Sequence, residues 1–200
     1  MKNLDVVFVN TNRMSLEDIL SSPFLTKEDL ESLSKFKVDE TKKEKACSLI
    51  LRNKYIGKYY FNEFGKPLSD DVFFNISHSK GVVVFVKDTI PIGIDIEKIR
   101  PIKEGMIDYI SSFEEKEYIK NEINFFEVWT NKESLAKNIG TGIKDKISEI
   151  PALPVNGMKE YKNKKYYSQT IKFDDYIITV TRETDELFQV LITDKENIYG

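Results

Sequence analysis

FFNISHSKGVVVFVKDTIPIGIDIE, residues 73–97, is the stretch from which we interpret the rest of the chain. Val82–Val86 and Ile92–Ile96 are rich in β-branched residues, and Pro91 and Gly93 mark a tight connection. This pattern predicts two short strands joined by a turn, with Ser77, His78 and Ser79 just before the first.

The second predicted strand carries two acidic residues, Asp95 and Glu97, separated by one position. Side chains alternate between the two faces of a strand. Asp95 and Glu97 are therefore expected on one face, and Ile94 and Ile96 on the core side. Two carboxylates about 4 Å apart repel by roughly 4 kcal/mol at an effective dielectric constant near 20. The chain tolerates this if one carboxylate is protonated, if both stay in water, or if a cation lies between them.

A second group of polar residues lies in FFEVWTNKESLAKNIGTGI, residues 125–143. Residues 124–138 are predicted to form a helix that Gly140 and Gly142 end. Trp129, Glu133 and Lys137 are four residues apart and share one helix face. Glu133 would add a third oxygen ligand to Asp95 and Glu97, and Mg²⁺ prefers oxygen ligands together with substrate phosphates. Each pattern alone also fits a solvated helix face or strand end.

Composition narrows the class of protein. The chain has 200 residues, 40% hydrophobic and 32% charged, which fits one globular unit of one or two subdomains. A net charge of −3 argues against nucleic-acid binding through bulk positive charge. The single cysteine, Cys47, and the single histidine, His78, exclude a disulfide framework and His-pair metal sites. We see no targeting signal and no membrane-spanning run, so we expect a cytoplasmic protein.

The remaining pattern predicts an α+β fold. A strand is expected at residues 4–10, and a turn at residues 64–67. Helices are expected at residues 15–20, 26–36, 40–60 and 106–121. The tail, residues 165–193, alternates like a β-meander covering one end of the fold. We expect two halves, residues 1–98 and 99–200, each a small sheet with helices.

Three motifs follow one another along the chain: FNISHS at residues 74–79, IGIDIE at residues 92–97 and FFEVWTNKESLAK at residues 125–137. Together with the turn at Gly65, Lys66 and Pro67, this set resembles the 4′-phosphopantetheinyl transferases of the surfactin-synthetase-activating type. The resemblance spans roughly residues 20–143. It implies a pseudo-twofold monomer of two similar α/β halves, each with a small, mainly antiparallel sheet, and coenzyme A in the cleft between them.

The resemblance also implies a reaction. Such enzymes move the phosphopantetheine arm of coenzyme A onto a serine hydroxyl of an apo acyl or peptidyl carrier protein and release adenosine 3′,5′-bisphosphate. By resemblance, Asp95, Glu97 and Glu133 would bind Mg²⁺. Lys137 would contact the diphosphate and assist the leaving group. Glu133 is also the best candidate base for the carrier serine.

The same resemblance implies contacts with coenzyme A. Ser77 and His78 would contact its phosphates. Lys66, with the backbone around Gly65, would hold the nucleotide end. Lys43 lies where the family often has a basic residue for the nucleotide phosphates.

This chain also departs from the family pattern. Asp29 and Ser32 stand where relatives often have lysines for the 3′-phosphate, so that phosphate would bind weakly or be served by Lys35, Lys42 or Arg52. The predicted helix at residues 106–120 is either a carrier-docking patch or ordinary core. Two other functions stay open: a non-catalytic relative that binds coenzyme A or a carrier protein, and an unrelated metal-dependent phosphohydrolase.

Overall fold

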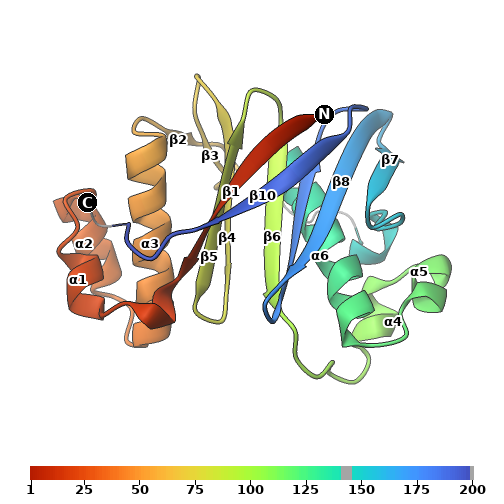
Figure 1. Ribbon diagram of the computed structural model, residues 1–200, viewed down its shortest axis with the longest axis horizontal. Coiled ribbons are helices and arrows are strands. Elements are labelled where there is room, and N and C mark those ends of the chain that lie inside the picture. Colours follow the sequence, from red (N-terminus) through yellow and green to blue (C-terminus); the bar gives the residue numbers. More distant parts are fainter. Residues whose placement is uncertain (141–145, 199–200) are drawn as a thin grey trace.

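The computed structural model describes residues 1–140 and 146–198, and it has four layers (Figure 1). Helices α1 (Leu16–Leu20), α2 (Lys27–Leu33) and α3 (Asp39–Tyr55) cover one sheet. Helices α4 (Met106–Ile110), α5 (Phe113–Tyr118) and α6 (Glu122–Ile139) cover the other sheet, and the two sheets pack against each other. The predicted α+β class, with small, mainly antiparallel sheets and helices, is confirmed.

The first sheet has the strand order β10-β1-β5-β4. Its strands are β1 (Lys2–Asn10), β4 (Phe73–Ser79), β5 (Val82–Asp88) and β10 (Phe188–Asp194). β5 runs antiparallel to both β1 and β4, whereas β10 runs parallel to β1. A 3₁₀ turn, η1 (Thr11–Arg13), follows β1.

The second sheet has the order β6-β9-β8-β7 and is antiparallel throughout. Its strands are β6 (Ile92–Lys98), β7 (Gly157–Tyr161), β8 (Lys164–Phe173) and β9 (Tyr176–Arg182). A short hairpin, β2 (Tyr60–Phe61) and β3 (Pro67–Leu68), carries the predicted turn, and a second 3₁₀ turn is η2 (Ile147–Glu149).

The core between the sheets confirms the alternation predicted for residues 92–97. Ile94 and Ile96 face the first sheet and belong to the core between the sheets, with exposures of 0% and 1%. Asp95 and Glu97 therefore face the other way, toward α6. The alternating apolar residues of β5 divide in the same manner: Val82 and Val84 face the second sheet, and Val83 faces the helices.

The two strands predicted in residues 73–97 are present as β5 and β6, but the stretch also forms a third strand, β4, which was not predicted. β4 and β5 make a hairpin whose turn, Lys80 and Gly81, has φ of 47° and 80°. β6 then leaves for the other sheet, where it pairs with β9. We overlooked β4 because its inward side chains are Asn75, Ser77 and Ser79; these contact β6 rather than an apolar core.

The predicted β-meander in the tail was wrong. β8 and β9 form a hairpin, but β10 crosses back and pairs with β1 in the first sheet. The first sheet therefore contains a strand from the C-terminal end, and β6 from before residue 99 lies in the second sheet. The sheets do not divide at residue 98, and the division into halves 1–98 and 99–200 stays a prediction.

Two predicted helices have different limits in the structure. The helix expected at residues 106–121 is two short helices, because Ser112 caps the start of α5 through a capping box with Glu115. The helix expected at residues 40–60 ends at Tyr55, and Gly57 follows with φ of 72°. The helix predicted at residues 124–138 is present as α6 and ends at Gly140, where φ is 78°. Gly142 lies outside the described residues.

Gly93 lets β6 and α6 approach closely. A Cβ atom there would lie 2.0 Å from the carbonyl oxygen of Ser134 and 2.5 Å from the backbone nitrogen of Asn138. Both atoms belong to the backbone of α6, which cannot shift without moving the helix. The glycine thus sets the distance between the strand that carries Asp95 and the helix that carries Glu133.

We expect acid to weaken the fold through Asp88, which joins the two sheets. Its buried side chain accepts hydrogen bonds from Lys2, from Arg182 Nε at 2.6 Å and from the backbone N–H of Thr89 at 2.7 Å. Burial alone would raise the pKa of Asp88, but these bonds outweigh it and hold the pKa below its ordinary value. Such a group stabilises the fold above its unfolded pKa of about 4, and this stability is lost as the pH falls through the lower, folded value.

Urea denaturation of the wild type and an Asp88→Asn variant from about pH 7 to pH 3 tests this expectation. At neutral pH the variant should lose about 3 kcal/mol, because Arg182 is left buried without its partner. As the pH falls below about 4, the difference in stability between the two proteins should shrink steadily. Asp71→Asn, at an exposed position, is the matched control. Parallel acid dependence of the wild type and Asp88→Asn would contradict the assignment.

Candidate active site

The polar face of β4 meets the acidic residues of β6. Ser77 Oγ donates to Asp95 Oδ1 at 2.8 Å, and Ser79 Oγ donates to Glu97 Oε2 at 2.9 Å. The side-chain oxygen of Asn75 accepts from the backbone N–H of Ile94 at 2.9 Å. These bonds connect the two sheets at the point where the acidic residues lie, so the site is built from both.

Helix α6 brings Lys137 to the same point. Lys137 Nζ donates to Asp95 Oδ1 at 2.6 Å and to Ser77 Oγ at 2.9 Å. Arg100 lies beside the other carboxylate, with Nη1 2.7 Å from Glu97 Oε2. The repulsion expected between Asp95 and Glu97 is thus offset by a separate cation on each.

Buried hydroxyl groups fix the position of α6 on the second sheet. Thr130 Oγ1 lies 2.7 Å from Thr179 Oγ1, and Ser134 Oγ lies 2.7 Å from Thr181 Oγ1. All four residues have an exposure of 0%. Because these bonds are buried, they define one register of the helix on the sheet and hence the position of Glu133.

Glu133 is half-buried near two other carboxylates and Lys137. Burial raises its pKa to about 7, the charges of Asp95 and Glu97 add to this, and Lys137 opposes it. Burial also raises the pKa of Asp95, although Lys137 and Ser77 favour its charged form. A carboxyl group whose pKa is close to neutral can accept a proton during a reaction at neutral pH.

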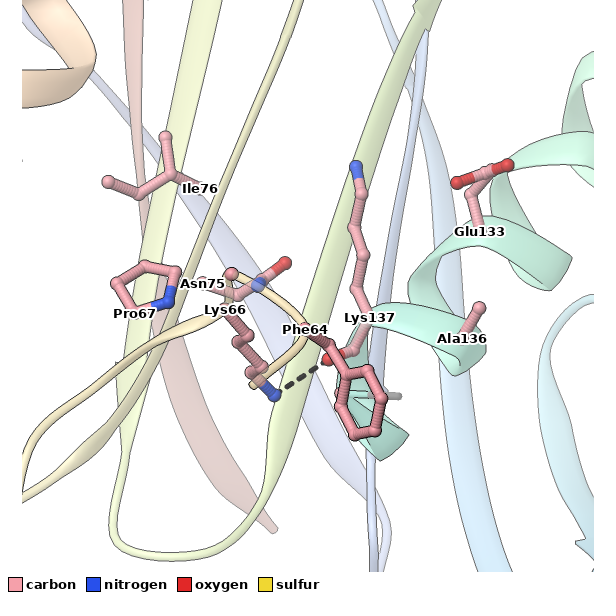
Figure 2. Close-up of a pocket in the computed structure, with 10 residues that line it drawn as sticks. Phe64, Lys66, Pro67, Asn75, Ile76, Glu133, Ala136 and Lys137 are labelled. Atoms are coloured by element: carbon pink, nitrogen blue, oxygen red, sulfur yellow. Dashed lines mark hydrogen bonds between the residues drawn. The ribbon is translucent and has the colours of Figure 1, made fainter. Parts of the chain in front are cut away.

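A pocket of about 290 Å³ opens beside Glu133 and Lys137 (Figure 2). Both side chains project from α6, and Phe64, from the β2–β3 hairpin, is another lining residue. Lys66 reaches the end of α6 and donates to the carbonyl oxygens of Lys137 at 2.7 Å and Asn138 at 3.1 Å. Burial lowers the pKa of Lys66 to about 8. The turn at Gly65 and Lys66 therefore forms part of the pocket wall.

A second pocket, of about 580 Å³, continues from the first between α2, α3 and β4. The two pockets share Pro67 and Ile76 in their walls. Its polar lining is mainly basic and includes Lys35, Lys45, Arg52 and His78, together with Ser32 and Ser48. The two pockets therefore adjoin: the first is lined by Glu133 with Lys66 and Lys137, and the second by basic groups.

His78 lines the second pocket, whereas Lys43 lies elsewhere. Lys43 Nζ donates to the carbonyl oxygen of Met14 at 2.6 Å, and the residue is outside the lining of both pockets. Lys45, two residues on, lines the second pocket and contacts His78 Nε2 at 3.2 Å. The roles assigned to Ser77, His78, Gly65, Lys66 and Lys43 stay predictions.

The carboxylates meet part of the requirement for Mg²⁺. Within residues 1–140 and 146–198, no group of three or more His, Cys, Asp or Glu side chains is arranged so that it could hold a metal ion as it stands. Instead, Lys137 forms an ion pair with Asp95, and Arg100 forms one with Glu97. Asp95 Oδ2, however, is buried and accepts no hydrogen bond. An oxygen donor without a partner, beside a second carboxylate whose pKa is raised to about 7, fits an oxygen-preferring cation.

Three contributors to the site were missed in the sequence: Asn75, Arg100 and Lys45. Asn75 and Arg100 lie close in sequence to the acidic motif, but nothing in their spacing showed that they contact it. Lys45 belongs to a run of basic residues, and only the packing of α3 shows which of them faces the pocket. A period-two polar pattern at Asn75, Ser77 and Ser79 was the one available signal for β4.

Comparison with known proteins supports this interpretation of the site. Residues 91–181 match the model of the 4′-phosphopantetheinyl transferase superfamily. This region contains β6 with its acidic motif, all of α6, and the β8–β9 hairpin that α6 packs on. This region is similar to that superfamily and includes the second and third of the three motifs, so the predicted resemblance to 4′-phosphopantetheinyl transferases is confirmed there.

Individual relatives are bacterial. The 4′-phosphopantetheinyl transferase gsp of Aneurinibacillus migulanus is 44% identical over 91 residues, which cover 41% of this chain and 38% of the relative. The transferase ffp of Bacillus subtilis is 38% identical over 102 residues, which cover 46% and 45%. The transferase Sfp of Bacillus subtilis strain 168 is 36% identical over 95 residues, which cover 43% and 42%. The chain thus matches less than half the length of these relatives.

Proposed function

We propose that this chain transfers the 4′-phosphopantetheine arm of coenzyme A to a serine hydroxyl of an apo acyl or peptidyl carrier protein and releases adenosine 3′,5′-bisphosphate. The observation that carries the proposal is that Glu133 and Lys137 of α6 line one pocket and that Lys137 is bonded to Asp95 of β6, both elements lying in the region that matches the superfamily. The second, basic pocket supports it, because coenzyme A is long and carries phosphate groups at two separate places.

The roles of the residues follow from their charges. Asp95, Glu97 and Glu133 would hold Mg²⁺, which when bound neutralises the negative charge of the diphosphate. Lys137 would move from Asp95 to the diphosphate and stabilise the charge that develops there. Phosphoryl transfer depends mainly on such positioning and charge stabilisation.

The transfer requires the serine hydroxyl of the carrier to lose one proton. The serine oxygen forms a bond to the β-phosphorus, and the bond from that phosphorus to the bridging oxygen breaks. The bridging oxygen leaves with adenosine 3′,5′-bisphosphate. Glu133 would accept the serine proton, and its pKa of about 7 suits a base at neutral pH.

The partner surface and location are further parts of the proposal. We propose that the carrier protein docks near α4 and α5, where Tyr109 and Phe113 are 65% and 76% exposed. Ile110, from the same predicted patch, is core, with 0% exposure. Among the helices in the described ranges, none has the length and apolar character that crossing a bilayer would need. We propose a monomer acting in the cytoplasm, without nucleic-acid or membrane partners.

Intact mass spectrometry tests the proposal. An apo carrier protein is incubated with this chain, coenzyme A and Mg²⁺, and a mass gain of one phosphopantetheine arm is expected. EDTA and an Asp95→Ala variant should each prevent the gain. Release of phosphopantetheine from coenzyme A without a carrier would instead indicate a phosphohydrolase. Binding of coenzyme A without transfer to any of several carriers would indicate a non-catalytic relative.

A further inference from the structure

A buried ion pair joins α5 to α6, outside the walls of the first and second pockets. Lys132 Nζ lies 2.7 Å from Glu115 Oε2, and the two side chains are 0% and 4% exposed. Lys132 also donates to the carbonyl oxygen of Ile150 at 2.5 Å. Glu115 accepts from the backbone N–H groups of Ser112 at 2.8 Å and of Ala152 at 2.9 Å. The pair thus holds three segments together: the start of α5, the middle of α6 and the segment that leads to β7.

Stability alone does not account for this ion pair. Burying two charges costs free energy that their attraction only about offsets, and apolar side chains of similar volume often stabilise a fold equally well. What a buried pair with satisfied hydrogen bonds adds is one defined arrangement of the segments that it joins. Here it defines how α5 lies against α6, and Figure 1 shows these two helices side by side.

Each of the two helices carries a residue of the proposed reaction next to the ion pair. Phe113, 76% exposed in the proposed docking surface, directly follows Ser112, whose backbone N–H donates to Glu115. Glu133 directly follows Lys132. Successive side chains on a helix are rotated by about 100°, so Lys132 lies in the interior while Glu133 lines the first pocket. The pair therefore connects the docking surface to the proposed base.

We propose that Glu115 and Lys132 are positioning residues for the carrier protein, because their ion pair fixes Phe113 relative to Glu133. This inference rests on the proposed function. Neither residue lines the first or the second pocket, so the pair acts on the carrier and not on coenzyme A. A docking surface that is already ordered binds more tightly than one that must become ordered on binding.

Two variants disturb the pair without leaving a lone buried charge, which would destabilise the fold. Glu115→Gln combined with Lys132→Met removes both charges together. Glu115→Asp keeps both charges but withdraws the carboxylate by one methylene group, and aspartate at this helix position still forms a capping box, as Asp29 does in α2. Circular dichroism and urea denaturation establish that each variant folds. Glu183→Gln combined with Lys164→Met, at a partly exposed ion pair, is the matched control.

Calorimetry with apo acyl and peptidyl carrier proteins, each with its serine replaced by alanine, measures docking without transfer. Phe113→Ala should weaken carrier binding by about tenfold, the loss of one apolar anchor. Each pair variant should weaken it by about fivefold or more, because the surface must then become ordered on binding. Added to Phe113→Ala, neither should cause more than about a further twofold loss, because the pair acts through Phe113.

The same variants should leave coenzyme A binding within about twofold of the wild type, and the control should bind the carrier and coenzyme A as the wild type does. In transfer assays the pair variants should raise KM for the carrier but leave KM for coenzyme A unchanged. A role confined to folding would lower both affinities together, and that result would overturn the inference.

The remaining outcomes separate this inference from the proposed function. Pair variants that bind the carrier as the wild type does, or whose losses add fully to that of Phe113→Ala, would overturn the inference alone. A wild type that docks carriers with the expected non-additive pattern but never modifies a carrier that keeps its serine would overturn the proposed function alone. A wild type that binds no carrier would overturn both.

Discussion

Replacing Glu133 with Gln should reduce kcat/KM for carrier modification by about 1000-fold or more, because both proposed roles of this residue need a carboxylate. Glutamine cannot accept the serine proton at neutral pH, and it removes one negative charge from the proposed cation site. The amide has nearly the shape of the acid, so the pocket should keep its form. Mass spectrometry of the carrier protein over a time course measures the rate.

The fold of this variant should survive, because burial and two neighbouring carboxylates already disfavour the charged form of Glu133. The free energy of unfolding in urea without metal should equal or exceed that of the wild type. Glu122→Gln, in the exposed first turn of α6, is the control and should keep full activity. A fully active Glu133→Gln would remove the residue from both roles.

Replacing Lys137 with Met should reduce transfer by at least about 100-fold and also destabilise the protein by about 3 kcal/mol. The loss of activity follows from the missing positive charge at the diphosphate. The loss of stability has another cause: Asp95, 4% exposed, keeps only Ser77 as a side-chain donor. A buried carboxylate without its cation is costly.

The double variant Asp95→Asn with Lys137→Met separates the two effects. Neutral asparagine removes the buried charge, so urea denaturation should show that much of the lost stability returns. Transfer activity should stay lost, since neither substitution restores a cation. Lys172→Met, exposed on β8, is the control for a general loss of charge. A double variant no more stable than Lys137→Met would show that the pair contributes nothing through the buried charge.

Local patterns in the sequence were enough to predict the two elements that carry the site. The alternation of Ile94 and Ile96 with Asp95 set the faces of β6, because a strand between a core and a polar cleft has to alternate. The end of α6 was predictable from Gly140, which adopts the left-handed conformation that ends helices. These features depend only on neighbouring residues.

Features that depend on distant residues were not predictable in this way. β10 looks like the next strand of a meander, and its pairing with β1 is decided by an edge formed nearly 190 residues earlier. The choice between Lys43 and Lys45 depends on how α3 is rotated against the first sheet. Side chains two residues apart on a helix point in very different directions, so Lys43 reaches Met14 and Lys45 reaches the second pocket.

The exchange of strands between the sheets has a consequence for how a substrate enters. The chain crosses between the two sheets twice, from β5 to β6 and from β9 to β10. Separating the sheets would have to stretch both crossings and break the serine–carboxylate bonds of β4 and β6. Under the proposed function, we therefore expect coenzyme A to enter by rearrangement of side chains that line the first pocket, such as Lys137 and Phe64, rather than by separation of the sheets.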